Sequence, residues 1–220
     1  MIEVADGVWL LTGFPRQVIN AYLVNDVLID AGTRWWRRSL PRQLRGRTLS
    51  LVALTHSHPD HQGAAAAICK EFGVPLACHE ADRAAMEGRE PFSPQNRIIA
   101  VSSRIFAGPA HPVSRELRPD DEVAGFRVVH APGHTAGHVM FFRERDRLAI
   151  AGDVLANIHF LTLRPGLREP PDFFSVDRRL NRQSIRMLAA LKPATVCFGH
   201  GPPLREPRLL DELVACLPSE

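Results

Sequence analysis

Cysteine is scarce in this sequence, and its four occurrences form no C-x-x-C pair. A chain of 220 residues can bury a core without disulfide bonds, so nothing in the sequence requires a cysteine framework. We therefore expect the thiols to be reduced and buried. They belong to Cys69, Cys78, Cys197 and Cys216.

Long apolar segments are also missing. No stretch approaches the roughly 20 consecutive apolar residues that a membrane-spanning helix requires. The first residues lack the basic segment and the apolar segment of a secretory signal peptide. We expect a cytoplasmic protein that has no membrane partner.

The charge is nearly balanced, with 27 Lys and Arg against 24 Asp and Glu and a net charge of +3. This balance offers no basic track for a nucleic acid, so we expect a small molecule as the partner. No G-x-S-x-G nucleophile elbow is present, and a serine nucleophile is therefore not indicated. Because repeats and low-complexity linkers are absent, residues 1–220 are predicted to form one domain.

Short apolar segments bounded by Gly, Asp and Pro dominate the first third of the chain and predict β-strands. They cover Val8–Thr12 and residues 21–24, 27–29 and 51–54. Asn25 and Asp26 tolerate positive φ and predict a tight hairpin between the second and third segments. The last segment leads through a polar loop into an alanine-rich helix that ends at Gly73, and residues 74–78 form the next strand. This βαβ order places the loop at the carboxyl end of a strand, where α/β folds usually place their sites.

The second half of the chain has a similar pattern. Strands are expected at Phe126–His130, at Val139–Arg143 and over residues 148–151 and 195–198. A helix is expected over residues 176–191, with Ser175 as its N-cap. Residues 82–120 are irregular, with helical candidates over residues 80–87 and 96–106 between proline-rich breaks. Two β-rich halves that each close with a helix predict an α/β fold in which two mixed sheets pack face to face with helices outside, an αββα sandwich.

Four metal-competent side chains occur within six positions, in the order H-x-H-x-D-H. On the extended part of this loop the alternate residues His56 and His58 point to the same side, which suits one cation. Asp60 and His61 follow where the helix begins, so they can face a second cation. Placing four such polar groups together is costly without an ion to satisfy them, and the cluster therefore predicts a metal site.

Three further polar residues follow apolar segments in the same way. His134 lies in P-G-H-T-A-G-H, Asp153 ends A-I-A-G-D, and His200 lies in F-G-H-G-P. The neighbouring glycines allow the backbone to turn sharply beside a crowded centre. His138, at the end of the first of these motifs, is an alternative to His134 as a ligand. Asp30, at the end of a predicted strand, either orients a ligand histidine or forms a simple turn.

The order of these motifs, H-x-H-x-D-H, P-G-H-T-x-G-H, G-D and G-H-G-P, resembles that of the metallo-β-lactamase superfamily over nearly the whole chain. The resemblance implies an αββα sandwich and a centre of two metal ions, usually zinc, with iron or manganese as alternatives. It also implies that the first histidine of the second motif is the ligand, rather than His138, and that Asp153 bridges the two ions. It assigns the first ion to His56, His58 and His134, and the second to Asp60, His61 and His200.

Such a centre predicts hydrolysis. Two cations that share a carboxylate lower the pKa of a water between them toward about 7, so that hydroxide exists at neutral pH. We predict attack on a small thioester, lactone or ester, with Asp60 acting both as a ligand and as the residue that orients the nucleophile. The bridging Asp153 resembles that of glyoxalase II, lactonase and phosphodiesterase relatives rather than that of the antibiotic-degrading members.

Other functions stay open at this point. Persulfide dioxygenases keep much of the same motif set and bind one iron through two His and one Asp, so a mononuclear iron enzyme is the main alternative to hydrolysis. A phosphodiesterase is another. A non-catalytic binding module is disfavoured, because such relatives usually lose ligands and this chain has lost none.

Residues 155–174 follow the bridging aspartate and are expected to overhang the metal centre. In this interpretation Phe160, Phe173 and Phe174 form an apolar substrate wall, and Arg164 supplies a cation for an acidic group. The alternative is a hydrophobic loop that packs over the edge of the sandwich without contacting substrate.

Overall fold

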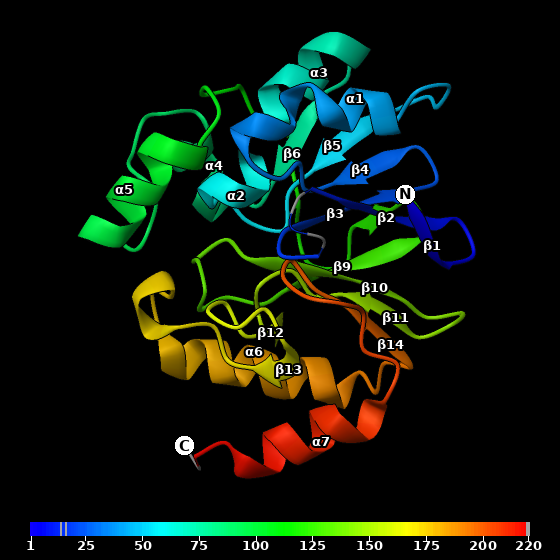
Figure 1. Ribbon diagram of the computed structural model, residues 1–220, viewed down its shortest axis with the longest axis vertical. Helices are drawn as coiled ribbons and strands as arrows, with labels where there is room; N and C mark the ends of the chain where they lie inside the picture. The colour runs from blue at the N-terminus through cyan, green and yellow to red at the C-terminus, as the bar shows by residue number, and fades with distance from the viewer. Residues whose placement is uncertain (14, 16, 219–220) are drawn as a thin grey trace.

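The computed structural model describes residues 1–13, 15 and 17–218. Within this part of the chain the strands form two large mixed sheets, stacked face to face, and a two-stranded ribbon (Figure 1). The first sheet contains, in spatial order, β1 (Ile2–Ala5), β2 (Val8–Thr12), β3 (Asn20–Val24), β4 (Val27–Ile29), β5 (Leu51–Ala53), β6 (Leu76–Cys78) and β7 (Arg115–Glu116). The second contains β14 (Thr195–Cys197), β11 (Leu148–Ile150), β10 (Val139–Arg143), β9 (Phe126–His130) and β8 (Glu122–Val123). The ribbon pairs β12 (Ala156–Ile158) with β13 (Pro165–Arg168).

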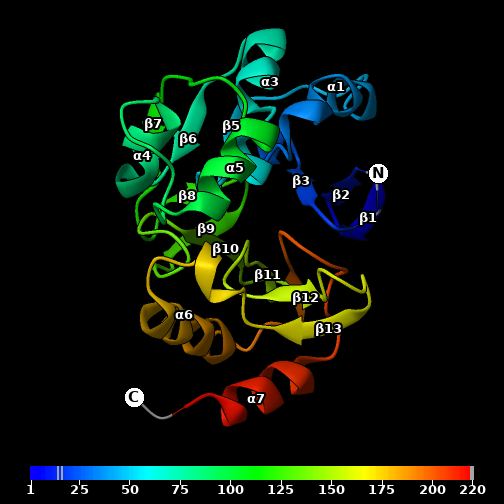
Figure 2. The same ribbon diagram turned by 60° about the vertical axis from the view of Figure 1, so that its left-hand side comes forward.

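Helices cover the outer faces of both sheets, as Figure 1 and the turned view in Figure 2 show. The first sheet is covered by α1 (Ser39–Gln43) and α3 (Ala65–Phe72), and the second by α6 (Arg178–Ala190), against which α7 (Pro207–Cys216) packs. Toward the left edge of Figure 1 lie α2 (Pro59–Gln62), α4 (Glu80–Met86) and α5 (Arg97–Phe106). Two short 3-10 helices complete the described elements, η1 (Arg34–Arg37) and η2 (Asp172–Phe174).

Both large sheets are buried on two faces, which explains their nearly continuous apolar strands. In β10, Val139 and Phe141 point into the layer between the sheets, whereas Met140 and Phe142 point into the layer that α6 covers. A third apolar layer lies between the first sheet and helices α1 and α3. Three apolar layers thus separate helices, sheet, sheet and helices, and the predicted αββα sandwich is confirmed.

Local signals predicted some element ends correctly and one incorrectly. Asn25 has the positive φ of 53° expected in the hairpin between β3 and β4, and Gly73, with a φ of 68°, ends α3. The predicted N-cap Ser175 is wrong. Helix α6 begins directly after Asp177, whose carboxylate accepts a hydrogen bond from the Leu180 N–H at 2.9 Å. A carboxylate three positions before a free N–H satisfies the usual N-cap geometry, which explains the later start.

The cysteines are all free thiols, and three of them are buried. Cys216 is exposed, so the expectation of burial is wrong for this residue. The inward stripe of α7 follows the helical spacing i, i+3, i+4 and i+7, and Cys216 falls outside it. Among the described residues, no helix is both long and apolar enough to cross a lipid bilayer.

Candidate metal centre

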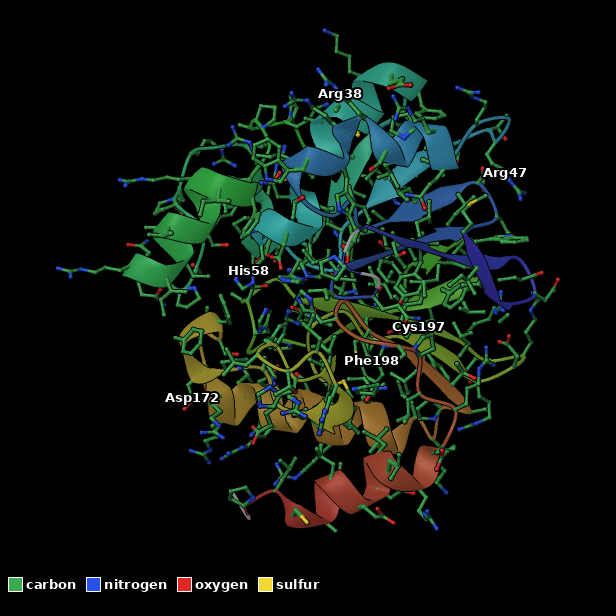
Figure 3. All side chains as sticks on the ribbon, viewed as in Figure 1. Arg38, Arg47, His58, Asp172, Cys197 and Phe198 are labelled. Atoms are coloured by element: carbon green, nitrogen blue, oxygen red, sulfur yellow. The ribbon has the colours of Figure 1, made fainter. Side chains whose placement is uncertain are left out.

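The structure brings the seven residues of the predicted centre together where the two sheets meet at one edge of the sandwich. Their side chains come from loops that follow β5, β9, β11 and β14 and from the short helix α2. Figure 3 labels His58 at the level between the upper and lower sheets. Donor atoms within 4.8 Å of one another form three overlapping groups, which are His56 with His58 and His134, His56 with His61 and Asp153, and Asp60 with His61 and His200. We call these seven residues the polar cluster.

Asp153 lies in the middle of the polar cluster. Its Oδ2 is 3.0 Å from Nε2 of His200, 3.4 Å from Nε2 of His61 and 3.6 Å from Nε2 of His134. One oxygen therefore borders histidines of both predicted ion sites. The other oxygen, Oδ1, is buried and has no hydrogen-bond partner in the described part of the chain. This is the arrangement that a carboxylate shared by two cations requires.

Hydrogen bonds at the outer nitrogen of His56 direct its inner nitrogen into the cluster. The hydroxyl of Thr55 donates to Oδ2 of Asp30 at 2.8 Å, so its oxygen accepts from the Nδ1–H of His56 at 3.0 Å. This chain of bonds places the proton on Nδ1 and leaves a lone pair on Nε2. That Nε2 is buried and has no hydrogen-bond partner among the described residues.

Asp30 orients a second histidine directly. Its Oδ2 accepts from the Nδ1–H of His61 at 2.9 Å, and its Oδ1 accepts from the backbone N–H of Thr55 at 2.8 Å. The predicted contact between Asp30 and a candidate ligand histidine is therefore present. Asp30 has a φ of 59°, a conformation that Asp and Asn adopt more readily than most residues. It fixes His61 by direct contact and His56 through Thr55.

His58 and His134 face each other across the boundary between the two sheets. The Nε2–H of His58 donates to the backbone carbonyl of Ser93 at 2.6 Å, which turns Nδ1 inward. This Nδ1 lies 2.9 Å from Nε2 of His134. The outer Nδ1 of His134 lies 3.3 Å from the hydroxyl of Ser175, which can accept its proton. The two inner nitrogens consequently converge on one point.

The loop that carries His200 is tied to the first sheet. The Nδ1–H of His200 donates to the backbone carbonyl of Val18 at 2.5 Å. The side-chain amide of Asn20 and the hydroxyl of Tyr22 both donate to the carbonyl of Phe198, at 2.9 and 2.7 Å. Phe198 is labelled in Figure 3 near the centre of the molecule. Strands β3 and β14, far apart in sequence, thus hold His200 with Nε2 toward the cluster.

Burial and neighbouring charges set the protonation of the cluster. Desolvation, reinforced by nearby imidazoles, holds the pKa of His56 and His134 well below the ordinary value, so both rings are neutral at pH 7. Burial opposes charge on His61 as well, but Asp153 and Asp30 outweigh it and hold that pKa well above the ordinary value. Burial likewise opposes the charge of Asp153, but His200 and His61 hold its pKa well below the ordinary value. The pKa of His200 is also raised, mainly by Asp153, so a cation held by His61 and His200 would bind with release of protons.

The chemistry of these donors fits divalent cations. Five imidazoles and two carboxylates, without a thiolate, suit zinc, iron or manganese. Three buried atoms of the cluster lack hydrogen-bond partners within the described chain, namely Nε2 of His56, Nε2 of His61 and Oδ1 of Asp153. Unsatisfied buried polar atoms are costly, and metal coordination removes that cost.

Gly199 allows the backbone to pass directly beside the cluster. A Cβ atom at this position would overlap Oδ1 of Asp153 and lie 2.5 Å from Cε1 of His61. No side chain fits there without displacing one of the two. The glycine of the G-H-G-P motif is therefore explained by close approach, since its φ is not in the left-handed region.

A cavity of about 280 Å³ opens above the polar cluster. Phe160 and Phe174 line it as predicted, and the ring of Phe160 lies edge-on to His200 with centroids 5.0 Å apart. Arg164 and Phe173 are exposed and do not line it, so the structure does not bring these two predicted substrate contacts to the cavity. Sequence reasoning missed two apolar residues of α5 that also line the cavity. We call four of the apolar lining residues, Ile99, Phe106, Phe160 and Phe174, the apolar wall.

His138, the alternative ligand, lies behind the cluster. Its Nε2 accepts a hydrogen bond from the backbone N–H of Asp153 at 3.0 Å, and desolvation lowers its pKa to about 3. It therefore holds the backbone of the central carboxylate as a neutral acceptor. Asp82, which the sequence did not single out, is also buried beside the cluster and bonds to residues adjacent to the histidines.

Comparison with known proteins agrees with this geometry. Residues 15–200 match the metallo-beta-lactamase superfamily. The probable metallo-hydrolase YflN of Bacillus subtilis (strain 168) is 29% identical over 92% of this chain and 86% of its own length. The hydroxyacylglutathione hydrolase GloC of Haemophilus influenzae is 30% identical over 60% of this chain and 61% of its own length.

Solved structures show the same architecture. TTHA1623, solved in a di-iron-bound form, superposes with a TM-score of 0.66 at 29% identity, covering 90% of this chain and 94% of that one. The matched residues 15–200 include all seven residues of the polar cluster. Fold, motif order and sequence similarity therefore lead to one conclusion, which is that this chain belongs to the metallo-β-lactamase superfamily.

Proposed function

We propose that the polar cluster holds two divalent cations and that the chain is a hydrolase of small, predominantly apolar esters, lactones or thioesters. The observation that carries this proposal is the convergence of side chains from four distant loops around Oδ2 of Asp153, where three buried donor atoms lack hydrogen-bond partners among the described residues. In this assignment His56, His58 and His134 form the first ion site. Asp60, His61 and His200 form the second, and Asp153 belongs to both.

The bound cations supply Lewis acidity and a nucleophilic hydroxide at neutral pH. The chain supplies orientation. Asp60 has the most exposed side chain of the carboxylates and imidazoles in the second site, 25% against 8% for His200, and it lines the cavity. It is the carboxylate placed to accept a hydrogen bond from an attacking water and to orient that water toward a substrate carbonyl.

The composition of the cavity supports an uncharged acyl or alkyl group in the substrate. Within the described part of the chain, Ser102 is the only lining residue outside the polar cluster that has a polar side chain. No Arg or Lys of residues 1–13, 15 and 17–218 is part of this lining. A pocket of apolar side chains with a few polar groups at one end favours a substrate whose reactive carbonyl is its main polar feature.

The similarity to a hydroxyacylglutathione hydrolase makes a thioester a reasonable member of this substrate class. The cavity lining nevertheless offers no cation for the two carboxylates of a glutathione group. We therefore place small apolar thioesters and esters ahead of glutathione thioesters. The metal is open between zinc and iron, because nitrogen and oxygen donors suit both and a similar protein has been solved with two irons.

The direct test combines elemental analysis with a hydrolysis screen. We expect about two cations per chain, loss of hydrolysis after chelation and recovery after metal is restored. The screen compares apolar esters, lactones and thioesters with a glutathione thioester and a phosphodiester. Metal-free protein that hydrolyses these compounds at the full rate contradicts the proposal. A single iron with oxygen consumption on a persulfide substrate supports the mononuclear dioxygenase in its place.

Asp60→Ala tests the role of the second site. Turnover is expected to fall about 100-fold or more, because a positioned carboxylate acting on a proton or water contributes on that order. Asp172→Ala is the matched control, since Asp172 is an exposed aspartate on η2 that pairs with Arg178 at 2.9 Å and does not line the cavity. Figure 3 shows it well below His58. Equal activity of both variants with a full metal content excludes the assigned role of Asp60.

A further inference from the structure

Asp82 is a buried carboxylate outside the proposed ligand set, with 4% of its surface exposed. It lies on α4, a segment that the sequence indicated as a helical candidate without singling out Asp82. Its Oδ2 accepts from the backbone N–H of Ser57 at 2.8 Å and from the hydroxyl of Thr135 at 2.9 Å. Its Oδ1 accepts from the backbone N–H of Gly137 at 2.9 Å. Both oxygens therefore accept hydrogen bonds from protein donors.

The three donors come from two different candidate ligand loops. Ser57 stands between His56 and His58 on the loop after β5, in the first sheet. Thr135 directly follows His134 on the loop after β9, in the second sheet. Asp82 is thus bonded to a residue next to His58 and to a residue next to His134, and so joins the two loops across the boundary between the sheets. By contrast, Asp30 bonds to Thr55 and His61 on the first sheet's side.

The close approach at Gly137 is specific to this contact. A Cβ atom there would lie 2.6 Å from Oδ1 and 2.7 Å from the backbone nitrogen of Asp82. Any larger residue would push α4 and the loop after β9 apart. The second glycine of the P-G-H-T-A-G-H motif therefore allows the carboxylate of Asp82 to lie directly against the loop that carries His134.

The first turn of helix α4 is held by contacts of His79 that do not involve the Asp82 carboxylate. The Nδ1 of His79 accepts from the backbone N–H of Ala81 at 3.2 Å and caps the helix. The ring of His79 stacks on His130 with centroids 4.2 Å apart and planes inclined by 4°. The Nε2–H of His130 donates to the carbonyl of Ala136 at 2.9 Å. These contacts hold the helix in place, so that a change at Asp82 acts mainly on the two loops.

We propose that Asp82 is a positioning residue that sets the separation of His58 and His134 and thereby the metal affinity of the first ion site. This inference rests on the proposed two-cation centre. Its physical basis is that two loops from different sheets have no covalent reason to keep a fixed spacing. A buried acceptor that binds both loops imposes that spacing, and partners behind ligands commonly alter metal affinity when they are removed.

Asp82→Asn is the sharpest substitution because it keeps the shape of the side chain. If the amide NH2 takes the place of Oδ2, it faces the N–H of Ser57, and if the amide is flipped, it faces the N–H of Gly137. Either orientation leaves one buried backbone donor without an acceptor. Thr135→Val is the second variant, since it removes only the hydroxyl that Asp82 accepts.

The experiment measures cation binding rather than turnover. Metal-free wild-type and variant proteins are titrated with cobalt(II) and with zinc, and crystals grown with limiting metal are examined by anomalous diffraction. For Asp82→Asn we expect affinity at the site of His56, His58 and His134 to fall about 10-fold to 100-fold, with the site of Asp60, His61 and His200 unchanged. Thr135→Val should weaken the same site by a smaller factor, and Thr135→Ser should restore it.

Two controls separate the possible results. Glu80→Gln, on an exposed residue of the same helix, should leave both affinities unchanged. Asp30→Asn should weaken both sites, because Asp30 orients His61 directly and His56 through Thr55, and this pattern differs from that of Asp82→Asn. Wild-type affinity at both sites in Asp82→Asn overturns the proposed role of Asp82. If Asp82→Asn does not fold, unaltered first-site affinity in Thr135→Val overturns it, whereas wild-type protein that binds no cation refutes the two-cation centre itself.

Discussion

The polar cluster and the apolar wall line the same cavity but are held by different kinds of interaction. In the cluster, the outer nitrogen of each histidine contacts a hydroxyl, carbonyl or carboxylate oxygen. The wall comes from α5 and from residues 155–174, which are joined by the hydrogen bond from the side-chain amide of Asn96 to the carbonyl of Phe173 at 2.7 Å. Beside it, Phe173 is 45% exposed and Leu161 is 90% exposed.

This difference indicates which part of the site is expected to tolerate change. Directional bonds to buried groups fix the donor atoms to within a fraction of an ångström, and a small displacement there is costly. Apolar contacts are not directional, so the wall can change its shape while it still excludes water. We expect substitutions in the cluster to abolish function and substitutions in the wall to change substrate preference.

The largest effect is expected for Gly199→Ala, which tests the rigidity of the cluster. The added methyl group overlaps Oδ1 of Asp153 and crowds His61, so one of these side chains must move. A displacement of about 1 Å can lower turnover on the order of 100-fold. Metal content and hydrolysis measured together check the effect. A variant that retains both at wild-type levels shows that the cluster adapts as easily as the wall does.

A smaller effect is expected for Phe174→Ala, which tests the wall. Removing the ring opens the cavity, and kcat/KM for an apolar ester is expected to fall about 10-fold, equivalent to about 1.4 kcal/mol. Metal content should be unchanged. The matched control is Phe173→Ala, because this neighbouring ring is exposed and does not line the cavity. Similar losses in the two variants would assign the effect to the local fold of η2 instead of to substrate contact.

The smallest effect is expected at Glu87, which follows the last residue of α4 and provides a half-buried counterpart to the fully buried carboxylates. Hydrogen bonds from the Arg83 side chain, the Val113 N–H and Arg89 lower its pKa from 4.5 to about 2. A depressed pKa means that Glu87 stabilises the fold above about pH 4.5 and loses this contribution as the pH falls toward 2.

Glu87→Gln should therefore lower the Tm slightly at pH 7 and have progressively less effect as the pH falls from 4.5 toward 2. Thermal unfolding of both proteins over this pH range, with metal removed, makes the measurement. A Tm difference that does not vary with pH would mean that the carboxylate charge contributes nothing there. The same substitution should leave cation affinity nearly unchanged, in contrast to Asp82→Asn.

Much of the fold followed from local pattern. The apolar strands of both sheets, the hairpin at Asn25 and the end of α3 at Gly73 were predicted because each depends on residues close together in sequence. The short strands β1, β7, β8, β12 and β13 and the helices α1 and α7 were not predicted. Strands of two to four residues carry too few positions for a period of two to be recognised, and their pairing depends on neighbours elsewhere in the chain.

The sequence likewise predicted the polar cluster well and the lining of the cavity beside it only in part. The H-x-H-x-D-H motif places four donors on one loop, so their proximity was visible in the sequence. The expected role of Arg164 rested on its position after Asp153, and the structure places it, exposed, between β12 and β13 and outside the cavity lining. Ile99 and Phe106 lie on α5, which the sequence indicated as a helical candidate, but only packing brings them over the cluster.

The sequence by itself determined the class of fold, the donor set and the loops that carry it, because strand periodicity and ligand spacing are properties of short segments. Tertiary structure alone decided which partners orient those donors. Asp82 and the carbonyl of Ser93 reach the proposed first ion site through contacts between residues distant in sequence, and the lining of the cavity depends on how α5 packs near Phe174. Such contacts follow from the packing of whole elements, and no short segment of sequence specifies them.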